Sequence, residues 1–144
     1  MKTQPLIVER TYDAPITRVW EAITNNEQMK KWYFDIESFK PEVGFRFQFY
    51  GSKDDLRYLH LCEVTEVVPG KKIAYTWRYA DHPGNSTVSF ELIAEGGKTR
   101  LVLTHTGLES FPSAADGNFA VGSFTQGWNA ILGKSLKAFV EKAD

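Results

Sequence analysis

The sequence predicts an α+β domain in which about seven antiparallel strands curve around one long C-terminal helix. The middle of the chain, residues 45–106, alternates between apolar and polar side chains, as strands with one buried face do. Residues 121–142 instead carry apolar side chains at helical spacing. A sheet of about seven strands is roughly 30 Å across, whereas a helix is only about 10 Å wide. We therefore expect the sheet to curl around the helix, with large side chains filling the gap or leaving a cavity.

The N-terminal part of the chain predicts a strand, two short helices and a second strand. Residues 6–12 (LIVERTY) have the composition of a strand. Residues 13–25 predict a helix, because Pro15 suits a first helical position. Apolar residues then follow at i, i+3, i+4 and i+7, namely Ile16, Val19, Trp20 and Ile23. A second short helix over residues 26–34 and a short strand over residues 35–39 complete this region.

Longer strands are predicted between Phe45 and Thr106. They cover residues 45–50, 57–68, 73–79, 87–95 and 98–106. We expect a bulge near Thr65 and Glu66, and a hairpin turn at Gly96 and Gly97. The following loop, residues 107–121, is long for a connector, and both a lid over a pocket and a plain surface loop fit it.

The last helix, from about Val121 to Lys142, combines an apolar stripe with two interior glycines. The stripe consists of Phe124, Trp128, Ile131, Leu132, Ser135, Leu136 and Phe139. Each glycine in a helix interior costs about 1 kcal/mol relative to alanine. Gly127 is predicted to lie on or beside the stripe, where it lets the helix approach the sheet or opens space beside Trp128. Gly133 points elsewhere, and the pattern assigns it no role.

One parity of the strands between residues 45 and 105 forms the predicted inner face, and it contains no Asp, Glu, Lys or Arg. Aromatic side chains are frequent on it, so a ligand pocket and a packed aromatic core both fit the pattern. For a pocket, the predicted ligand-binding residues are Trp32, Phe47, Tyr58, His60, Tyr75, Trp77, Tyr79, Phe90, His105 and Trp128. On the other parity, Leu59 and Leu61 break the polar pattern, which indicates either a bulge or a surface that contacts a partner.

Catalytic and metal chemistry has few candidates on this inner face. His60 and Cys62 share it at i and i+2, and His105 is expected on a nearby strand. A metal site needs three or four ligands in matched geometry, and this face supplies no carboxylate. Nucleophilic catalysis by Cys62 would lack an orienting Asp or Asn. We therefore predict no catalytic residue, no metal ion and no cofactor, and expect a buried thiol and two hydrogen-bonded histidines.

Composition places the chain among ordinary globular proteins. Its 144 residues are 42% hydrophobic and 24% charged, which fits one domain over residues 1–144. The formal net charge of −1 argues against nucleic acid or an anionic membrane as the main partner. We expect no membrane span, because no apolar run approaches ~20 residues, and the N-terminus lacks the apolar region of a signal peptide. With a single cysteine, Cys62, no internal disulfide is possible, and we expect a cytoplasmic protein.

Several motifs follow one another along nearly the whole chain. They are DAPITRVWEAIT, MKKWY, EVGFRFQF at 42–49, CEVTEVVPGKKIAYTWR at 62–78, TRLVLTHTGL at 99–108 and GWNAILGKSLKAFVE at 127–141. In this ordered set the chain resembles the START-type, helix-grip superfamily (SRPBCC), and within it the branch of heat-shock-protein-90 ATPase activator homologues. The resemblance implies a curved antiparallel sheet around a long C-terminal helix, two small helices at one end, and an internal hydrophobic pocket. Phe45 stands where many relatives have a second glycine, which would shrink or reshape that pocket.

The resemblance leaves three functions open. The leading hypothesis is a binding protein for an apolar, lipid-like or polycyclic aromatic small molecule, held between the sheet and the last helix. A cyclase- or hydrolase-type enzyme could use the same pocket, as polyketide cyclases of the superfamily do. The third is a protein-interaction module related to chaperone regulation, with a working surface near Leu59 and Leu61. The eukaryotic co-chaperone of this branch has a separate N-terminal domain that these 144 residues do not include, so chaperone activation is not expected. A homodimer is compatible with the sequence.

Overall fold

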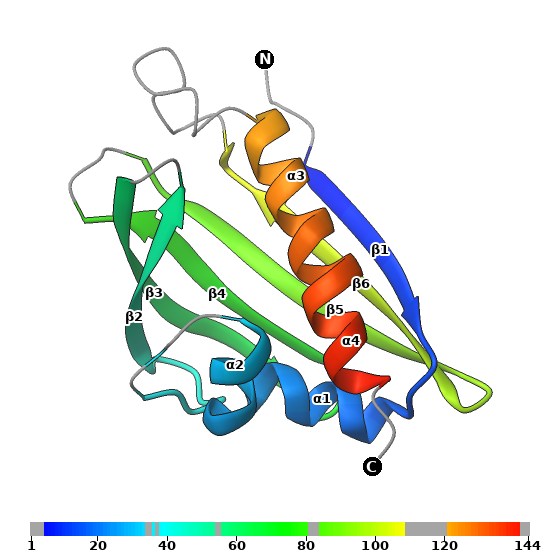
Figure 1. The fold of residues 1–144 in the computed structure, drawn as a ribbon. Coiled ribbons are helices and arrows are strands. Elements are labelled where there is room, and N and C mark those ends of the chain that lie inside the picture. The colour runs from blue at the N-terminus through cyan, green and yellow to red at the C-terminus, as the bar shows by residue number, and fades with distance from the viewer. Residues whose placement is uncertain are drawn as a thin grey trace.

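The computed structural model describes residues 5–33, 36, 38–53, 56–80, 84–108 and 121–141, without the side chains of 51–53, 56–58 and 121–123. It confirms the predicted fold class: Figure 1 shows one curved, unclosed sheet that wraps along the C-terminal helix. The strands are β1 (Leu6–Tyr12), β2 (Arg46–Lys53), β3 (Leu56–Val68), β4 (Lys72–Tyr79), β5 (Ser86–Glu95) and β6 (Lys98–Thr106). The helices are α1 (Ile16–Thr24), α2 (Asn26–Trp32), α3 (Val121–Ala130) and α4 (Lys137–Val140). A π-helical segment, Ile131–Leu136, joins α3 to α4, and the three pieces together form the last helix.

The strands follow the order β1-β6-β5-β4-β3-β2, and neighbouring strands are antiparallel. Strands β1 and β2 are therefore the two edges of the sheet. The register of β3 against β4 shifts between Val64 and Glu66, which confirms the predicted bulge. Gly96 and Gly97 join β5 to β6 with φ angles of 56° and 88°, which glycine adopts readily, so the predicted hairpin is also confirmed.

The described sheet has six strands rather than about seven, because the prediction of a strand over residues 35–39 is wrong. Asp35 and Glu37 lie outside the described residues, whereas Ile36 and Phe39 are buried in a connection without regular structure. The side-chain amide of Asn26 donates a hydrogen bond of 2.8 Å to the Ile36 carbonyl. Burial of two separate apolar side chains, and not pairing with another strand, explains the apolar pattern of this segment.

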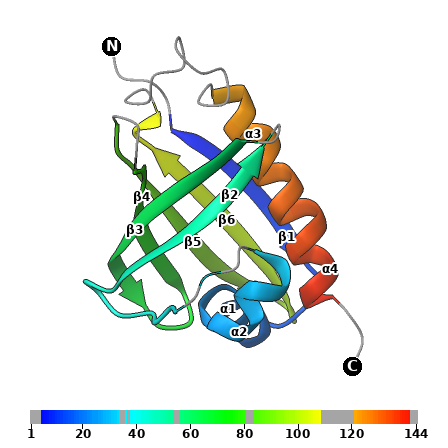
Figure 2. The ribbon, with the colours of Figure 1, turned by 60° about the vertical axis from the view of Figure 1, so that its left-hand side comes forward.

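Helices α1 and α2 lie at one end of the sheet, beside the C-terminal end of the last helix (Figure 2). The side chain of Asn25 begins α2 by accepting a hydrogen bond of 3.1 Å from the backbone N–H of Gln28. Trp32 ends α2 and is buried, and its indole N–H donates to the Ala22 carbonyl of α1 at 2.8 Å. This bond fixes the two short helices to each other.

The apolar stripe of the last helix differs from the predicted one. The buried side chains that form it are Phe124, Trp128, Leu132, Leu136 and Val140. These residues are spaced four apart throughout, which exceeds the period of about 3.6 in an α-helix. The π-helical segment has wider turns with i→i+5 hydrogen bonds, and it compensates for the drift of the α-helical turns on either side. Ser135 is consequently exposed, and Ile131 and Phe139 are only half-buried.

The sequence predicts a packing role for Gly127 and none for Gly133, whereas the structure shows the reverse. Gly127 is exposed, and a Cβ built on it would meet no atom within 4 Å, so the predicted role in helix approach is wrong. Gly133 does have a close neighbour, because a Cβ there would lie 3.2 Å from Nε of Arg10 on β1.

The predicted inner face is buried where the structure describes it. The buried residues of this face on β2 to β6 are Phe47, Phe49, His60, Cys62, Val64, Ile73, Tyr75, Trp77, Tyr79, Val88, Phe90, Leu92, Leu101, Leu103 and His105. Phe45 is half-buried and packs edge-on against Phe39, with ring centroids 6.2 Å apart. The core therefore sits between the concave side of the sheet and the last helix, as the predicted curl requires.

Candidate functional site

An aromatic cluster lies between the sheet and the last helix, with Trp128 of α3 at its centre. The Trp128 ring centroid is 5.3 Å from that of Trp77 on β4 and 6.0 Å from that of Phe90 on β5. It is also 6.3 Å from the ring of Tyr33, which directly follows α2. These separations are typical of packed aromatic pairs. Rings from the helix, the sheet and the end of α2 thus pack directly on one another.

The cluster continues beneath the edge strand β2. The imidazole of His60 on β3 stacks on Phe49 of β2, with centroids 4.6 Å apart and planes inclined by 14°. Trp77 and Tyr79 each approach the His60 ring edge-on at 4.7 Å. Trp77 also lies 5.7 Å from Phe49 and so connects this part to the rings around Trp128. None of these residues carries a carboxylate, an ammonium or a guanidinium group.

His105 on β6 joins the cluster to a chain of buried hydrogen bonds. The indole N–H of Trp128 donates to Nδ1 of His105 at 3.1 Å, so Nδ1 is the nitrogen without a proton. Nε2 then carries the proton and donates to the Ser86 hydroxyl at 2.7 Å. The Ser86 hydroxyl donates in turn to the Trp77 carbonyl at 2.7 Å. Neutral His105 is the form that completes this chain.

Two buried titratable groups, His105 and Cys62, are poorly suited to catalysis. Burial lowers the pKa of His105 to about 3, because desolvation disfavours the charged imidazolium. Burial also raises the pKa of the Cys62 thiol, against a smaller opposing effect of Arg78. A base as weak as this imidazole accepts protons inefficiently at neutral pH, and a protonated thiol is a poor nucleophile. The sequence predicts a buried thiol and hydrogen-bonded histidines, and Cys62 and His105 are found in these environments.

Two more polar pairs lie within the cluster. The hydroxyls of Tyr33 and Tyr75 are 2.7 Å apart, and the indole N–H of Trp77 donates to the Tyr79 hydroxyl at 3.0 Å. Burial raises the pKa of Tyr33 and of Tyr75 well above the ordinary value, so both phenols stay protonated. His105, Tyr33 and Tyr75 are therefore uncharged, and hydrogen-bonding groups occur at several points of the cluster.

The structure brings most of the predicted binding residues into this one cluster. Its members among them are His60, Tyr75, Trp77, Tyr79, Phe90, His105 and Trp128. Phe47 joins through Tyr75, with centroids 5.0 Å apart, and Trp32 stacks on Tyr33 at 4.9 Å. Tyr58 belongs to β3, but its side chain lies outside the described residues. Whether these side chains bind a ligand stays a prediction.

Three members of the cluster, Tyr33, Phe49 and Ser86, are not among the binding residues that the sequence predicts. The two-residue period already places Phe49 on the inner face with Phe47, but Phe49 is not chosen as a binding residue. Ser86 has the parity of Val88, so the same period extended by one step would have placed it on that face. Tyr33 follows a short helix and belongs to no periodic pattern. Its position is fixed by the packing of α2, which the sequence alone does not show.

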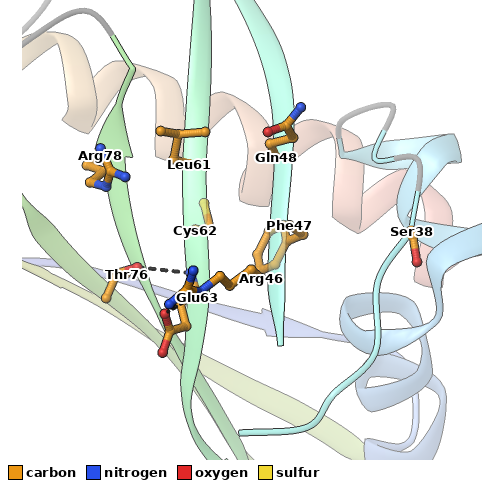
Figure 3. A pocket seen from close by; sticks show the side chains of 9 residues that line it. All are labelled: Ser38, Arg46, Phe47, Gln48, Leu61, Cys62, Glu63, Thr76 and Arg78. Atoms are coloured by element: carbon orange, nitrogen blue, oxygen red, sulfur yellow. Dashed lines mark hydrogen bonds and ion pairs between the residues drawn. The ribbon is translucent and has the colours of Figure 1, made fainter. Parts of the chain in front are cut away.

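A groove of about 520 Å³ lies on the other side of the sheet, over β2, β3 and β4 (Figure 3). Its side chains of outward parity are Arg46, Gln48, Leu61, Glu63, Thr76 and Arg78. Nε of Arg46 lies 3.1 Å from Oε1 of Glu63, and the backbone N–H of Glu63 donates to the Thr76 hydroxyl at 2.9 Å. Leu61, which breaks the polar pattern in the sequence, is half-buried in this groove. The groove offers a mixed polar and apolar surface without a nucleophile paired to a base.

The described residues also bear on metal binding and on membrane insertion. Within those ranges, no group of three His, Cys, Asp or Glu side chains could hold a metal ion. None of the described helices is long and apolar enough to cross a membrane. The predictions that the protein uses no metal ion and no cofactor stay predictions.

Comparisons with known proteins agree with the motifs in the sequence. A family model described as "Activator of Hsp90 ATPase homolog 1-like protein" matches residues 13–141. The structure of protein MLL2253 from Mesorhizobium loti has 28% identity and a TM-score of 0.81, and the match covers 98% of this chain and 99% of that chain. Protein CV1439 from Chromobacterium violaceum has 23% identity and a TM-score of 0.80, over 96% of this chain and 98% of that one. DynU16, a protein in the dynemicin biosynthetic locus, has 19% identity and a TM-score of 0.78, over 97% of this chain and 48% of that one. A comparison with curated proteins finds no match.

Proposed function

The chain belongs to the family of activator of Hsp90 ATPase homolog 1-like proteins, and from that premise we propose that it binds a neutral, planar aromatic small molecule between its sheet and its last helix. The observation that carries the proposal is the aromatic cluster around Trp128, which is continuous from β2 to α3. Aromatic rings that pack on one another can pack on a ligand ring in the same way. DynU16, which shares the fold, is in the dynemicin biosynthetic locus, and such a setting is compatible with ligand binding.

The chemistry of the cluster favours a neutral ligand. A charged ligand among these rings would lose its hydration without gaining a partner of opposite charge. Polar groups that are available in the cluster include the hydroxyls of Tyr33, Tyr75 and Tyr79 and the indole N–H of Trp77. They suit a hydroxyl or carbonyl group on an otherwise apolar ligand, because each can exchange its present partner for the ligand.

Binding requires one ring to move, because the rings already pack on one another. Tyr33 is the side chain that we expect to move. It is half-buried, follows the last residue of α2, and reaches the cluster through its hydrogen bond to Tyr75 and its contact with Trp128. A ligand ring would then occupy the place of the Tyr33 ring against Trp128.

Binding fits the geometry better than catalysis does. The enzyme alternative needs a titratable group with a pKa near neutrality, whereas His105 has a pKa lowered to about 3 and both ring nitrogens already bonded. We therefore propose a carrier or receptor, with no turnover of the ligand. A cytoplasmic location is part of the proposal, because the single cysteine is a buried free thiol.

A second candidate function, a protein-interaction surface, rests on the groove in Figure 3. Leu61 is half-buried there beside Arg46 and Arg78, and leucine is unusual on the polar parity of a strand. A pull-down with the heat-shock-protein-90 chaperone, using Leu61→Ala as the variant, distinguishes this function from ligand binding. If the groove is an interaction surface, the chaperone should be captured and Leu61→Ala should weaken its capture. If the protein instead binds a ligand inside the cluster, Leu61→Ala should leave the ligand affinity unchanged.

The test of ligand binding uses a pair of fluorescent probes. N-phenylnaphthylamine is neutral and polycyclic, and anilinonaphthalenesulfonate has a similar shape with a negative charge. We expect the neutral probe to bind at least about tenfold more tightly than the charged one, because no lysine or arginine belongs to the described cluster. Trp128→Ala and Trp77→Ala should each weaken the neutral probe by about tenfold or more.

Two further variants make the test specific to the cluster. Trp20→Ala removes a half-buried tryptophan of α1 that lies outside the cluster, and it should leave the affinity within about twofold. Tyr33→Ala should strengthen binding, because the ring that the ligand displaces is then absent. If folded Trp128→Ala and Trp77→Ala proteins bind the neutral probe as the unchanged protein does, the proposed site is wrong.

A further inference from the structure

Arg10 is a charged residue at an inward position of the sheet. It lies on β1 between Val8 and Tyr12, which have the same parity and are buried against the core. In the register of β1 and β6 it is paired with Leu101, which is fully buried. Arg10 itself is exposed, because β1 is an edge strand and its long side chain lies along the last helix at Asn129 and Gly133. An apolar residue is what the pattern of this face would place here.

The Arg10 guanidinium lies against the last helix at Asn129 and Gly133, a place that we call the seat of the guanidinium. A Cβ at Gly133 would lie 3.2 Å from Nε and 3.3 Å from Nη2 of Arg10, which is closer than most Cβ contacts, so the guanidinium would have to shift slightly to admit a larger residue. Nη2 of Arg10 donates to Oδ1 of Asn129 at 2.7 Å. The amide of Asn129 is oriented in turn, because its Nδ2 donates to the Thr125 carbonyl at 2.9 Å. The guanidinium is thus held in place by neutral groups, and its charge stays uncompensated by them.

The seat lies in a groove of about 750 Å³ between β1 and the last helix, which run beside each other in both ribbon views (Figure 1, Figure 2). Polar and cationic groups that line it include Arg10, Thr11, Gln126, Asn129, Lys134 and Lys137. The volume is within the range of roughly 300 to 1,000 Å³ that small-molecule sites have. A whole organic molecule fits there, not only an ion.

The charges of the groove are unbalanced toward the positive. Glu9 is its carboxylate, and it lies 3.6 Å from the guanidinium of Arg100. Lys137 pairs with Glu141. Among the described residues, no carboxylate lies within ion-pair distance of Arg10 or Lys134. This local excess of cations occurs in a chain whose formal net charge is −1.

We propose that this groove is a second small-molecule site, which binds an organic anion through a carboxylate or phosphate group on Arg10. A guanidinium has five N–H donors in a rigid fork, and only part of that fork is used by Asn129. The remaining donors match the paired oxygens of a carboxylate or phosphate. Lys134 supplies the second cation, and the side-chain amide of Gln126 can orient the rest of the molecule. The site is separate from the proposed aromatic site, since it takes an anion and lies on another side of the helix.

The test titrates the full chain with inorganic phosphate, phenyl phosphate and benzoate, followed by NMR. We expect saturable shifts of the Gly133 backbone amide, the Asn129 side-chain amide and Nε–H of Arg10. Tighter binding of phenyl phosphate than of benzoate assigns the natural group as a phosphate, and the reverse order assigns it as a carboxylate. Weaker binding of inorganic phosphate than of either organic probe supports a site built for a whole molecule.

Variants separate a fitted site from general electrostatic attraction. Arg10→Gln should weaken binding of the better probe by at least about tenfold. Arg46→Gln removes the same charge from the other edge strand and should change it by less than about twofold. Gly133→Ala keeps every charge but displaces the guanidinium, and it should also weaken binding. Equal losses for Arg10→Gln and Arg46→Gln, or shifts that never saturate with any probe, would overturn the proposal.

Discussion

Two sides of the last helix meet the rest of the molecule in opposite ways. The side that faces the concave sheet carries Phe124, Trp128, Leu132, Leu136 and Val140, and all of them are buried. The polar atoms on that side belong to neutral pairs, such as the Trp128 indole and the His105 imidazole. The side that faces β1 carries Asn129, Gly133 and Lys134 and receives the Arg10 guanidinium.

Adjacent positions of this helix face opposite chemical environments. Leu132 and Gly133 are adjacent in the chain, yet the first is fully buried in the apolar core and the second supports a cation. The π-helical segment makes this separation possible, because it keeps the apolar stripe on a period of four residues. A neutral aromatic ligand on one side and an anion on the other would be chemically independent.

The largest expected contrast is in stability. Leu132→Ala should lower the free energy of unfolding by about 2 to 5 kcal/mol, because the side chain is fully buried and leaves a cavity. Lys134→Ala, two positions along the same helix, should change it by less than about 0.5 kcal/mol, because that side chain is exposed. Urea denaturation of both variants measures the difference. Similar losses for the two would mean that the helix does not pack as described.

The next contrast depends on pH. The pKa of His105 is lowered to about 3 in the folded chain, so below pH 6.5 the unfolded chain binds a proton that the folded chain refuses. Stability should therefore fall as the pH decreases from about 6.5, at up to roughly 1.4 kcal/mol per pH unit. In His105→Gln this part of the slope should disappear between about pH 6.5 and 5, above the range where most carboxylates titrate. A slope unchanged by the substitution would show that His105 is not buried in its neutral form.

Most of the fold could be predicted from the sequence, because period-two alternation follows directly from burial of one face of a sheet. The inner face from Phe47 to His105, the bulge near Thr65 and the Gly96-Gly97 hairpin are all of this local kind. Where an apolar segment packs without pairing, as at Ile36 and Phe39, the same rule predicted a strand that the described residues 36, 38 and 39 do not form.

The parts that could not be predicted depend on the fit between distant elements. The helical stripe was misplaced because a π-helical segment has no signal in a pattern based on α-helical turns. The hydrogen bonds of His105 depend both on the register of β5 against β6, which places Ser86, and on the position of Trp128 on the last helix. Neither can be deduced from a local pattern. The contact between Arg10 and Gly133 could not be predicted, because it depends on β1 lying beside the last helix. An arginine at an inward position of residues 6–12 did, however, depart from the apolar pattern of that face.

A smaller effect is expected at the point where β1 and the last helix are joined. The Tyr12 hydroxyl donates a hydrogen bond of 2.8 Å to the Leu132 carbonyl within the π-helical segment. Burial raises the pKa of Tyr12, so the phenol stays protonated and remains a donor at ordinary pH. Tyr12→Phe should lower the free energy of unfolding by about 1 kcal/mol. Hydrogen exchange should also show faster opening at residues 131–136 in this variant, whereas Tyr50→Phe, an exposed tyrosine on β2, should leave these amides unchanged.

The smallest effect distinguishes the two glycines. Gly127→Ala should raise the free energy of unfolding by about 0.5 to 1 kcal/mol, because alanine favours the helix and its Cβ would meet no atom within 4 Å. Gly133→Ala has the same intrinsic benefit, but its Cβ would press on Arg10 at 3.2 Å, so its gain should be smaller or absent. Combining Gly133→Ala with Arg10→Gln should restore most of the missing gain, because the shorter side chain can move aside. If Gly133→Ala alone stabilises the chain as much as Gly127→Ala does, the guanidinium is not seated on the helix, and the contrast between the two sides is lost.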